Sequence, residues 1–145
     1  MNISKGILLG LVSLFFIQAI PLAEEESVGI EFFQGTWEEA LQTAEKGNKM
    51  IFLDAYTTWC GPCKLLKRNV FPNERVGKFY NKNFINVKVD MEKGIGRKLS
   101  SRYRVTVYPT LLFIDGEGNM IKKAVGYHPA QQLIELGRSV ISQKS

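Results

Sequence analysis

Apolar runs and helical patterns alternate along most of this 145-residue chain. The runs Met50–Tyr56 and Phe84–Val89 are apolar without full polar alternation, which is typical of strands covered on both faces. A helical pattern between them requires a crossover, so we expect these two strands to be parallel. A hairpin signal, Asp115–Asn119, joins Thr110–Ile114 to Met120–Val125. This order predicts an α/β fold with a central mixed β-sheet flanked by helices.

Start and stop signals predict the remaining elements. Thr36 is followed three residues later by Glu39, a capping-box pattern that predicts a helix to about Lys46. Ile30–Phe33 precedes that helix as an expected short first strand. We expect further helices over residues 60–69, 73–80, 94–103 and 129–141.

The first 23 residues predict a secretory signal peptide. Lys5 precedes an apolar run over residues 6–20, which only Ser13 and Gln18 interrupt, and the small residue Ala23 offers a cleavage site. An uncleaved membrane anchor is the alternative, but a spanning helix needs roughly 20 apolar residues and this run is shorter. We therefore expect a signal peptide over residues 1–23, an N-terminal segment with the first strand and helix over 24–48, and the core of one domain over 49–145.

The charge balance gives little support to nucleic-acid binding. Removal of residues 1–23 takes away one of 19 basic residues and no acid, which leaves 18 − 14 = +4. No block of five like charges occurs, so the basic side chains indicate a solvated surface.

Cys60 and Cys63 are the two cysteines of the chain, and they lie three positions apart. A Cys-x-x-Cys pair is typical of sites that make and break a disulfide with a partner. The alternative is half of a zinc site, for which only His128 remains as a soft ligand and no second Cys-x-x-Cys exists. The pattern favours a redox enzyme with no metal and no other cofactor.

With these motifs in place, the chain resembles the thioredoxin-fold family over about residues 49–140. Residues 59–64 read Trp-Cys-Gly-Pro-Cys-Lys, the active-site signature of thioredoxins. Asp54 lies six residues before Cys60, where the family keeps a buried acid, and residues 107–110 match the loop that carries the family's cis-proline, here Pro109. Residues 69–76 are more similar to exported thioredoxin-like domains, such as the carboxy-terminal domain of the membrane reductase DsbD.

Roles for the reacting residues follow from the motif and from this resemblance. Cys60 is expected at a helix start, as the exposed nucleophile whose thiolate the helix dipole stabilises. Cys63 is expected to be more buried and to resolve the mixed disulfide. The resemblance implies that Asp54, with a pKa raised by burial, exchanges a proton with Cys63 through water. An acid that caps a loop, and a Pro109 that merely starts a strand, are the alternatives.

Partner docking is expected around the cysteines. Pro62 suits the first helical turn, and Gly61 leaves the backbone open to an approaching chain. The other candidate substrate-binding residues are Trp59, Val107, Tyr108, Gly126 and Tyr127, with ordinary half-buried packing as the alternative. One family feature is expected to be absent, because Asn86 and Lys88 straddle the place where many thioredoxins have a lysine near the buried acid.

The leading hypothesis is an exported, periplasmic thiol–disulfide oxidoreductase, most similar to the reducing members of the family because Gly-Pro separates its cysteines. The expected partners are disulfide-containing protein substrates and a membrane electron donor, with the chain itself a monomer that binds no nucleic acid. Attachment to the membrane, facing the periplasm, is the alternative location. A disulfide oxidase or isomerase and a redox-quiet binding module are the alternative functions.

Overall fold

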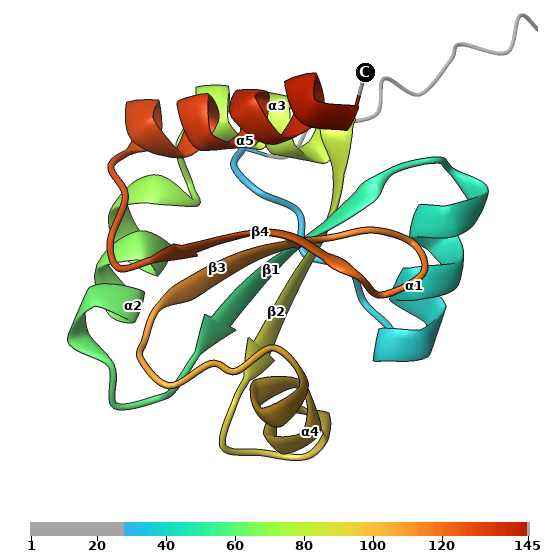
Figure 1. Ribbon diagram of the computed structural model, residues 1–145. Coiled ribbons are helices and arrows are strands. Elements are labelled where there is room, and N and C mark those ends of the chain that lie inside the picture. The colour runs from blue at the N-terminus through green and yellow to red at the C-terminus, as the bar shows by residue number, and fades with distance from the viewer. Residues whose placement is uncertain (1–27, 145) are drawn as a thin grey trace, which may run out of the picture.

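Four strands form one mixed sheet in the order β2-β1-β3-β4, in a computed structural model that describes residues 28–144. β1 (Met50–Tyr56) is parallel to β2 (Phe84–Asp90), as the crossover predicted. β1 is antiparallel to β3 (Thr110–Ile114), and β3 is antiparallel to β4 (Met120–Val125), which confirms the hairpin. The carboxyl ends of β1 and β2 therefore lie at the same edge of the sheet (Figure 1).

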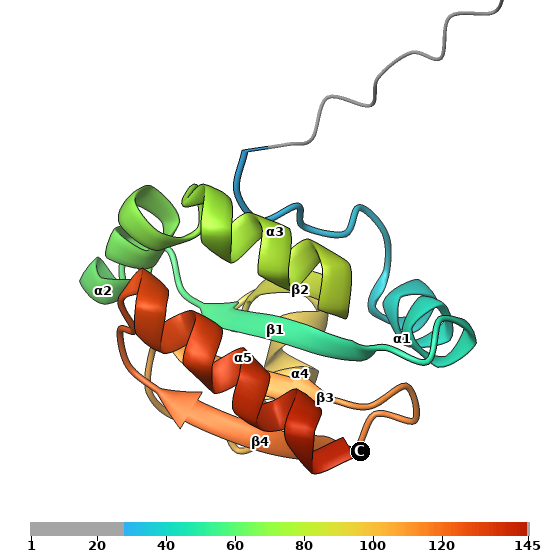
Figure 2. The same cartoon turned by 90° about the horizontal axis from the view of Figure 1, so that it is seen from above.

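Helices cover both faces of the sheet, as expected (Figures 1 and 2). One face carries α1 (Trp37–Lys46) and α4 (Ile95–Arg102). The other face carries α2 (Gly61–Leu65), the π-helical turn η1 (Leu66–Val70), α3 (Glu74–Asn83) and α5 (Ala130–Lys144).

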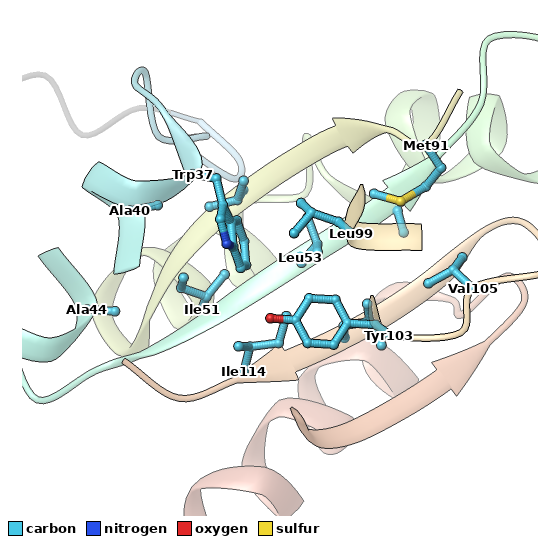
Figure 3. Close-up of a cluster of buried hydrophobic side chains, with 13 residues drawn as sticks. Trp37, Ala40, Ala44, Ile51, Leu53, Met91, Leu99, Tyr103, Val105 and Ile114 are labelled. Carbon is cyan, nitrogen blue, oxygen red and sulfur yellow. The ribbon is translucent and has the colours of Figure 1, made fainter. Parts of the chain in front are cut away.

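The face under α1 and α4 is filled by the odd-numbered side chains of β1. Ile51 and Leu53 pack against Trp37 and Ala40 of α1, and Leu99 of α4 belongs to the same buried cluster (Figure 3). Side chains alternate between the two faces along a strand. The even-numbered side chains of β1 must therefore point to the opposite face.

The opposite face has an aromatic core. Phe52 of β1 lies 4.6 Å from Tyr80 of α3 between ring centres, and Phe84 lies 5.3 Å from Phe113. The buried Tyr80 hydroxyl donates a hydrogen bond of 2.7 Å to the carbonyl of Leu133, so α3 and α5 are tied together. Asp54 has the same parity as Phe52 and therefore faces the side of α2, η1 and α3.

The expectation of a first strand over residues 30–33 is wrong. This stretch is part of an extended N-terminal segment, residues 28–36, that forms no ladder with β2. Phe33 N–H donates to the carbonyl of Asn86, but the N–H and carbonyl of Glu31 are bonded to the side chains of Asn81 and Asn86. The side-chain amides of Asn81 and Asn86 thus form the hydrogen bonds with the backbone of Glu31 that a neighbouring strand would otherwise form.

The helix expected over residues 60–69 is not one regular α-helix. It begins as α2, as predicted, but Phe71 N–H donates to the carbonyl of Leu66, an i to i+5 bond that makes η1 a π-helical turn. The following helix starts where the sequence predicted, because Asn73 Oδ1 caps the N–H groups of Arg75 and Val76. The capping box of Thr36 and Glu39 at α1 is likewise confirmed.

The expected signal peptide, residues 1–23, lies outside the described residues. Within residues 28–144, no helix combines the length and the apolar character that crossing a membrane requires.

Candidate active site

Cys60 and Cys63 form a disulfide at the carboxyl-terminal edge of the sheet, just beyond β1, with their Cα atoms 5.3 Å apart. Open α/β sheets place their reactive groups at this edge. The position expected for the Cys-x-x-Cys pair is therefore the one observed.

Cys60 is the N-cap residue of α2. Its extended backbone (φ −71°, ψ 113°) turns the side chain back over the helix, and Cys63 N–H donates to Cys60 Sγ at 3.2 Å. Pro62 lies in the first turn, where its missing N–H costs nothing. Nothing lies within 4 Å of the place where Gly61 would carry a Cβ, so the backbone beside Cys60 is open to an approaching chain.

The expected difference in exposure between the two cysteines is not seen in the disulfide form. Cys60 is 3% exposed and Cys63 is 7% exposed, so Cys60 is not the more accessible residue. Cys60 is buried because its side chain caps the first turn of α2. Its Sγ atom forms the disulfide with Cys63 and also accepts the hydrogen bond from Cys63 N–H.

Asp54 is buried in β1, with 5% of its surface exposed. Burial removes the carboxylate from water and raises its pKa from 3.8 to about 7, although the charge of Lys88 acts in the opposite direction. Its Oδ1 atom is buried and has no hydrogen-bond partner among the described residues. The direction of this pKa shift is the one that the sequence predicted.

One cavity of about 280 Å³ connects Asp54 with Cys63. Thr57 also lines it, with a buried Oγ1 atom that lacks a partner within residues 28–144. A water molecule takes up about 30 Å³ in the liquid, so the cavity has room for several. The remaining lining residues are Phe32, Tyr56, Thr58, Lys64, Lys67, Phe71 and Lys88.

The expectation that no lysine lies near the buried acid is wrong. Lys88 is opposite Asp54 in the parallel register of β1 and β2, so both side chains are on the same face of the sheet. Lys88 lines the same cavity and lowers the pKa of Asp54. Pairing the first residues of the two predicted strands, Met50 and Phe84, gives this register and was the signal that could have found it.

The loop before β3 contains a cis peptide bond between Tyr108 and Pro109, as the resemblance implied. The carbonyl of Pro109 accepts a 2.8 Å hydrogen bond from Gly126 N–H, and Gly126 has a φ of 93° that favours glycine. Thr110 Oγ1 donates to the carbonyl of Val107 at 2.7 Å. The N–H and carbonyl of Tyr108 have no partner in the part of the chain that the structure describes.

Three of the expected docking side chains are exposed apolar groups. Trp59 is 63% exposed, Val107 is 49% exposed and Tyr127 is 39% exposed. The rings of Trp59 and Tyr108 meet edge to face, with their centres 5.9 Å apart. The structure thus brings the Cys-x-x-Cys loop and the Pro109 loop into contact.

Glu92 is a site residue that the sequence did not indicate. It lies between β2 and α4, and both oxygens of its carboxylate accept from Trp59 Nε1 at 3.1 Å. Trp59 and Glu92 are 33 positions apart, and neither position has a pattern that links it to the other. The exposed indole is therefore held from two sides, by Glu92 and by Tyr108.

Comparison with known proteins identifies the family of this fold. The family model of the thioredoxin-like domain matches residues 37–141. The chain belongs to the thioredoxin-like family. A solved structure of a candidate disulphide-isomerase from Bacteroides thetaiotaomicron is 40% identical and superposes with a TM-score of 0.71, over 82% of this chain and 98% of that one.

Two curated relatives are similar over shorter stretches. A thioredoxin of Mycoplasmoides gallisepticum is 36% identical over 61% of this chain and 82% of its own length. The thiol:disulfide interchange protein DsbD of Pseudomonas fluorescens is 31% identical over 55% of this chain, but the match spans only 14% of that longer protein.

This thioredoxin-like oxidoreductase fold therefore carries its disulfide pair at a helix start, beside a buried acid. The arrangement combines a capping sulfur, Cys60, with a second sulfur, Cys63, that shares a cavity with Asp54. Such a set of groups can exchange a disulfide with a partner and move one proton.

Proposed function

We propose that this chain is an exported oxidoreductase that reduces protein disulfides through a dithiol–disulfide cycle of Cys60 and Cys63. The observation that carries the proposal is the cavity that Cys63 and Asp54 both line, together with the Cys60–Cys63 disulfide at the start of α2. Exchange needs a nucleophile, a resolving thiol and a proton acceptor, and these three groups are neighbours here.

In the first half of the cycle, the Cys60 thiolate attacks one sulfur of the partner's disulfide. A bond forms between Cys60 and the partner, the partner's own S–S bond breaks, and its second sulfur leaves as a thiolate that takes a proton from water. Cys60 is suited to this step because the first turn of α2, including Cys63 N–H, stabilises negative charge on its sulfur.

In the second half, Cys63 gives its thiol proton to Asp54 through water in the cavity and attacks Cys60. The Cys60–Cys63 disulfide forms, the bond to the partner breaks, and the reduced partner leaves with two electrons. Asp54 suits the transfer because its pKa, about 7, is near neutral pH. A dithiol electron donor then returns the pair to the reduced form by the reverse exchanges.

The partner is proposed to bind as an extended segment beside the disulfide. The unpaired N–H and carbonyl of Tyr108 are available for main-chain hydrogen bonds, and Trp59 and Tyr127 offer exposed rings. Binding through the partner's backbone suits a broad set of disulfide-containing proteins.

Reduction outside the cytoplasm is supported by three observations. Residues 1–23 have the pattern of a signal peptide, and Gly61-Pro62 between the cysteines resembles reducing members of the family. The resemblance of residues 69–76 to exported domains such as that of the membrane reductase DsbD, together with the 31% identity to a DsbD protein, supports a periplasmic location and a membrane protein as the electron donor.

An isomerase is the second candidate, because a solved structure with 40% identity is described as a candidate disulphide-isomerase.

The reduction potential separates reductive from oxidative use of the pair. A potential near that of thioredoxin, about −270 mV, is expected, and one near that of DsbA, about −120 mV, would reject the reductase.

Trapping tests the cycle directly. The exported chain with Cys63→Ala is expected to retain partners as mixed disulfides on Cys60, which acid quenching and alkylation preserve for identification. The matched control, Cys60→Ala with Cys63→Ala, should retain none. Absence of trapped partners, together with no catalysed reduction of insulin disulfides by the unmodified chain, would favour the redox-quiet binding module.

Export is tested separately by N-terminal sequencing of the protein recovered from the cell envelope. A mature chain that begins at or near Glu24 is expected. A chain that keeps Met1 and is recovered with membranes would support the uncleaved anchor.

A further inference from the structure

The Lys88 side chain lies over an aromatic ring of the N-terminal segment. Its Nζ is 5.0 Å from the centre of the Phe32 ring, within the range of a cation–π contact. Phe32 is half-buried, and its ring meets that of Phe71 edge to face at 5.3 Å. Both Phe32 and Lys88 line the cavity that contains Asp54.

The backbone on either side of Phe32 is firmly attached to the domain. Glu31 N–H donates to Asn81 Oδ1 at 2.9 Å, and the carbonyl of Glu31 accepts from Asn86 Nδ2 at 3.2 Å. Phe33 N–H donates to the carbonyl of Asn86 at 2.7 Å. The ring is thus supplied by a segment outside the sheet, yet its place beside Lys88 is determined by β2 and α3.

Several titratable groups surround the Asp54 side of this cavity. β1 contributes Tyr56, β2 contributes Lys88, and α2 with η1 contributes Lys64 and Lys67. Cys63 also lines the cavity, but it has no proton to lose while it is in the disulfide. The N-terminal segment contributes no charged side chain to the lining, only Phe32. Of the charges, that of Lys88 is the one that lowers the pKa of Asp54.

We propose that Phe32 is a positioning residue that holds the Lys88 ammonium at the cavity that Asp54 also lines, on the same face of the sheet. The consequence for catalysis rests on the function proposed above, whereas the contact itself does not. Without the ring, the Lys88 amine extends into water, where its attraction for Asp54 is weakened by screening. Less Asp54 is then ionised at neutral pH to accept the proton of Cys63.

A double-mutant cycle tests whether Phe32 acts through Lys88. The readout is the titration of the Asp54 carboxyl, followed by carbon-13 NMR in the disulfide form, which requires no activity. Phe32→Leu retains an apolar side chain but no aromatic face, and Lys88→Met removes the charge. Both are expected to raise the pKa of Asp54, whereas Phe32→Leu added to Lys88→Met should raise it no further.

Two comparisons complete the cycle. Phe32→Tyr keeps the aromatic face and is expected to keep the titration of the unmodified chain. Phe79→Leu is the matched control, because Phe79 is also half-buried and its ring centre lies 5.9 Å from Arg138 Cζ. Phe79 does not line the cavity that contains Asp54. It should leave the titration unchanged. A Phe32→Leu variant with an unchanged or lowered Asp54 pKa, or with the same shift when Lys88 is Met, would overturn the inference.

Stopped-flow reduction of a small disulfide substrate at pH 7 tests the catalytic consequence. Phe32→Leu is expected to slow resolution of the mixed disulfide by about two- to five-fold. This is the ratio that the free energy of one exposed cation–π contact represents. Failure of the unmodified chain to reduce any disulfide would reject the proposed function and leave the titration test valid. Normal resolution by a Phe32→Leu variant would reject the role of Phe32 alone.

Discussion

At the scale of single residues, the protonated form of Asp54 favours the folded state, whereas its proposed role as a proton acceptor requires the ionised form. Its pKa rises from 3.8 to about 7 on folding, mainly because burial disfavours the charged form. Between these values the folded chain holds a proton that the unfolded chain has lost. The contribution of Asp54 to stability is therefore complete below about pH 4 and is lost as the pH rises through about 7.

Replacement of Asp54 with Asn should remove this dependence on pH. One pKa unit corresponds to 1.36 kcal/mol, and pH 5 lies about two units below the folded pKa of Asp54. The free energy of unfolding of the unmodified chain should therefore be about 3 kcal/mol lower at pH 8 than at pH 5. Urea unfolding of the oxidised protein at the two pH values measures the difference. An unmodified chain that is equally stable at both, or an Asp54→Asn variant with the same loss, would contradict the assignment.

The contact of Glu92 with Trp59 gives a second prediction. Glu92→Ala frees the indole, so KM for a protein substrate should rise about two- to five-fold while kcat stays nearly constant, as expected for loss of one exposed hydrogen bond. Acrylamide quenching reports the change, because Trp59 is exposed and Trp37 is buried. Glu92→Gln keeps one acceptor and serves as the control. Equal quenching and KM in Glu92→Ala would rule out this positioning role.

The reacting residues could be predicted from the sequence more completely than their surroundings. Cys60 and Cys63 are found by their spacing, and Asp54 by its place six residues before Cys60, where the resemblance to the family implies a buried acid. Lys88 and Glu92 reach the site from another part of the chain, through the register of β2 and the course of the loop after it. A spacing argument along one segment has no access to such contacts.

At the scale of elements, the N-terminal segment depends on close contact between two glycines. A Cβ on Gly77 of α3 would overlap the backbone of Gly29. The N-terminal segment can therefore lie this close to α3 because Gly77 lacks a side chain, whereas a Cβ on Gly29 would meet the backbone of Phe71 and Pro72.

Gly77→Ala should therefore loosen the N-terminal segment. Overpacking of this kind costs about 1–3 kcal/mol, and we expect a Tm lower by at least about 5 °C. Thermal unfolding followed by circular dichroism measures it. Gly61→Ala is the control for stability, because nothing lies within 4 Å of its Cβ position. A Gly77→Ala variant as stable as the unmodified chain would show that the contact is not tight.

The same segment shows why one predicted element failed. Residues 30–33 are apolar and extended, as a strand would be, but Asn81 and Asn86 bond the backbone of Glu31 in place of a neighbouring strand. Local propensity describes the conformation of a segment and not the partner of its hydrogen bonds. The other predicted strands were confirmed because each has a neighbour on the sheet.

At the scale of the whole molecule, β4 is an edge strand with no neighbour on its outer side among residues 28–144. Met120 and Ile121 are 44% and 43% exposed, and Lys122 follows them with its Nζ bonded to Ser139 Oγ at 2.9 Å. Lysines on an edge strand oppose pairing with a second chain. This supports the expectation of a monomer.

Sedimentation analysis should show a single monomeric species over the micromolar range. Lys122→Ile removes this lysine from the edge strand and is expected to cause association that increases with concentration. Lys98→Ile, a change of the same kind on the exposed surface of α4, is the control and should remain monomeric. A dimer of the unmodified chain would contradict the prediction.

Sequence patterns alone were enough to predict the mixed sheet, the four strands that form it and the place of the cysteine pair beyond β1. These features follow from periodicity and spacing within short segments, so no knowledge of distant contacts is needed to predict them. Three contacts could be found only in the folded structure: Lys88 lies opposite Asp54, Glu92 holds Trp59, and the Lys88 ammonium lies over the ring of Phe32. The reason is physical: each of these contacts joins segments that are far apart in the chain and meet only after the sheet register and the packing of the faces are established.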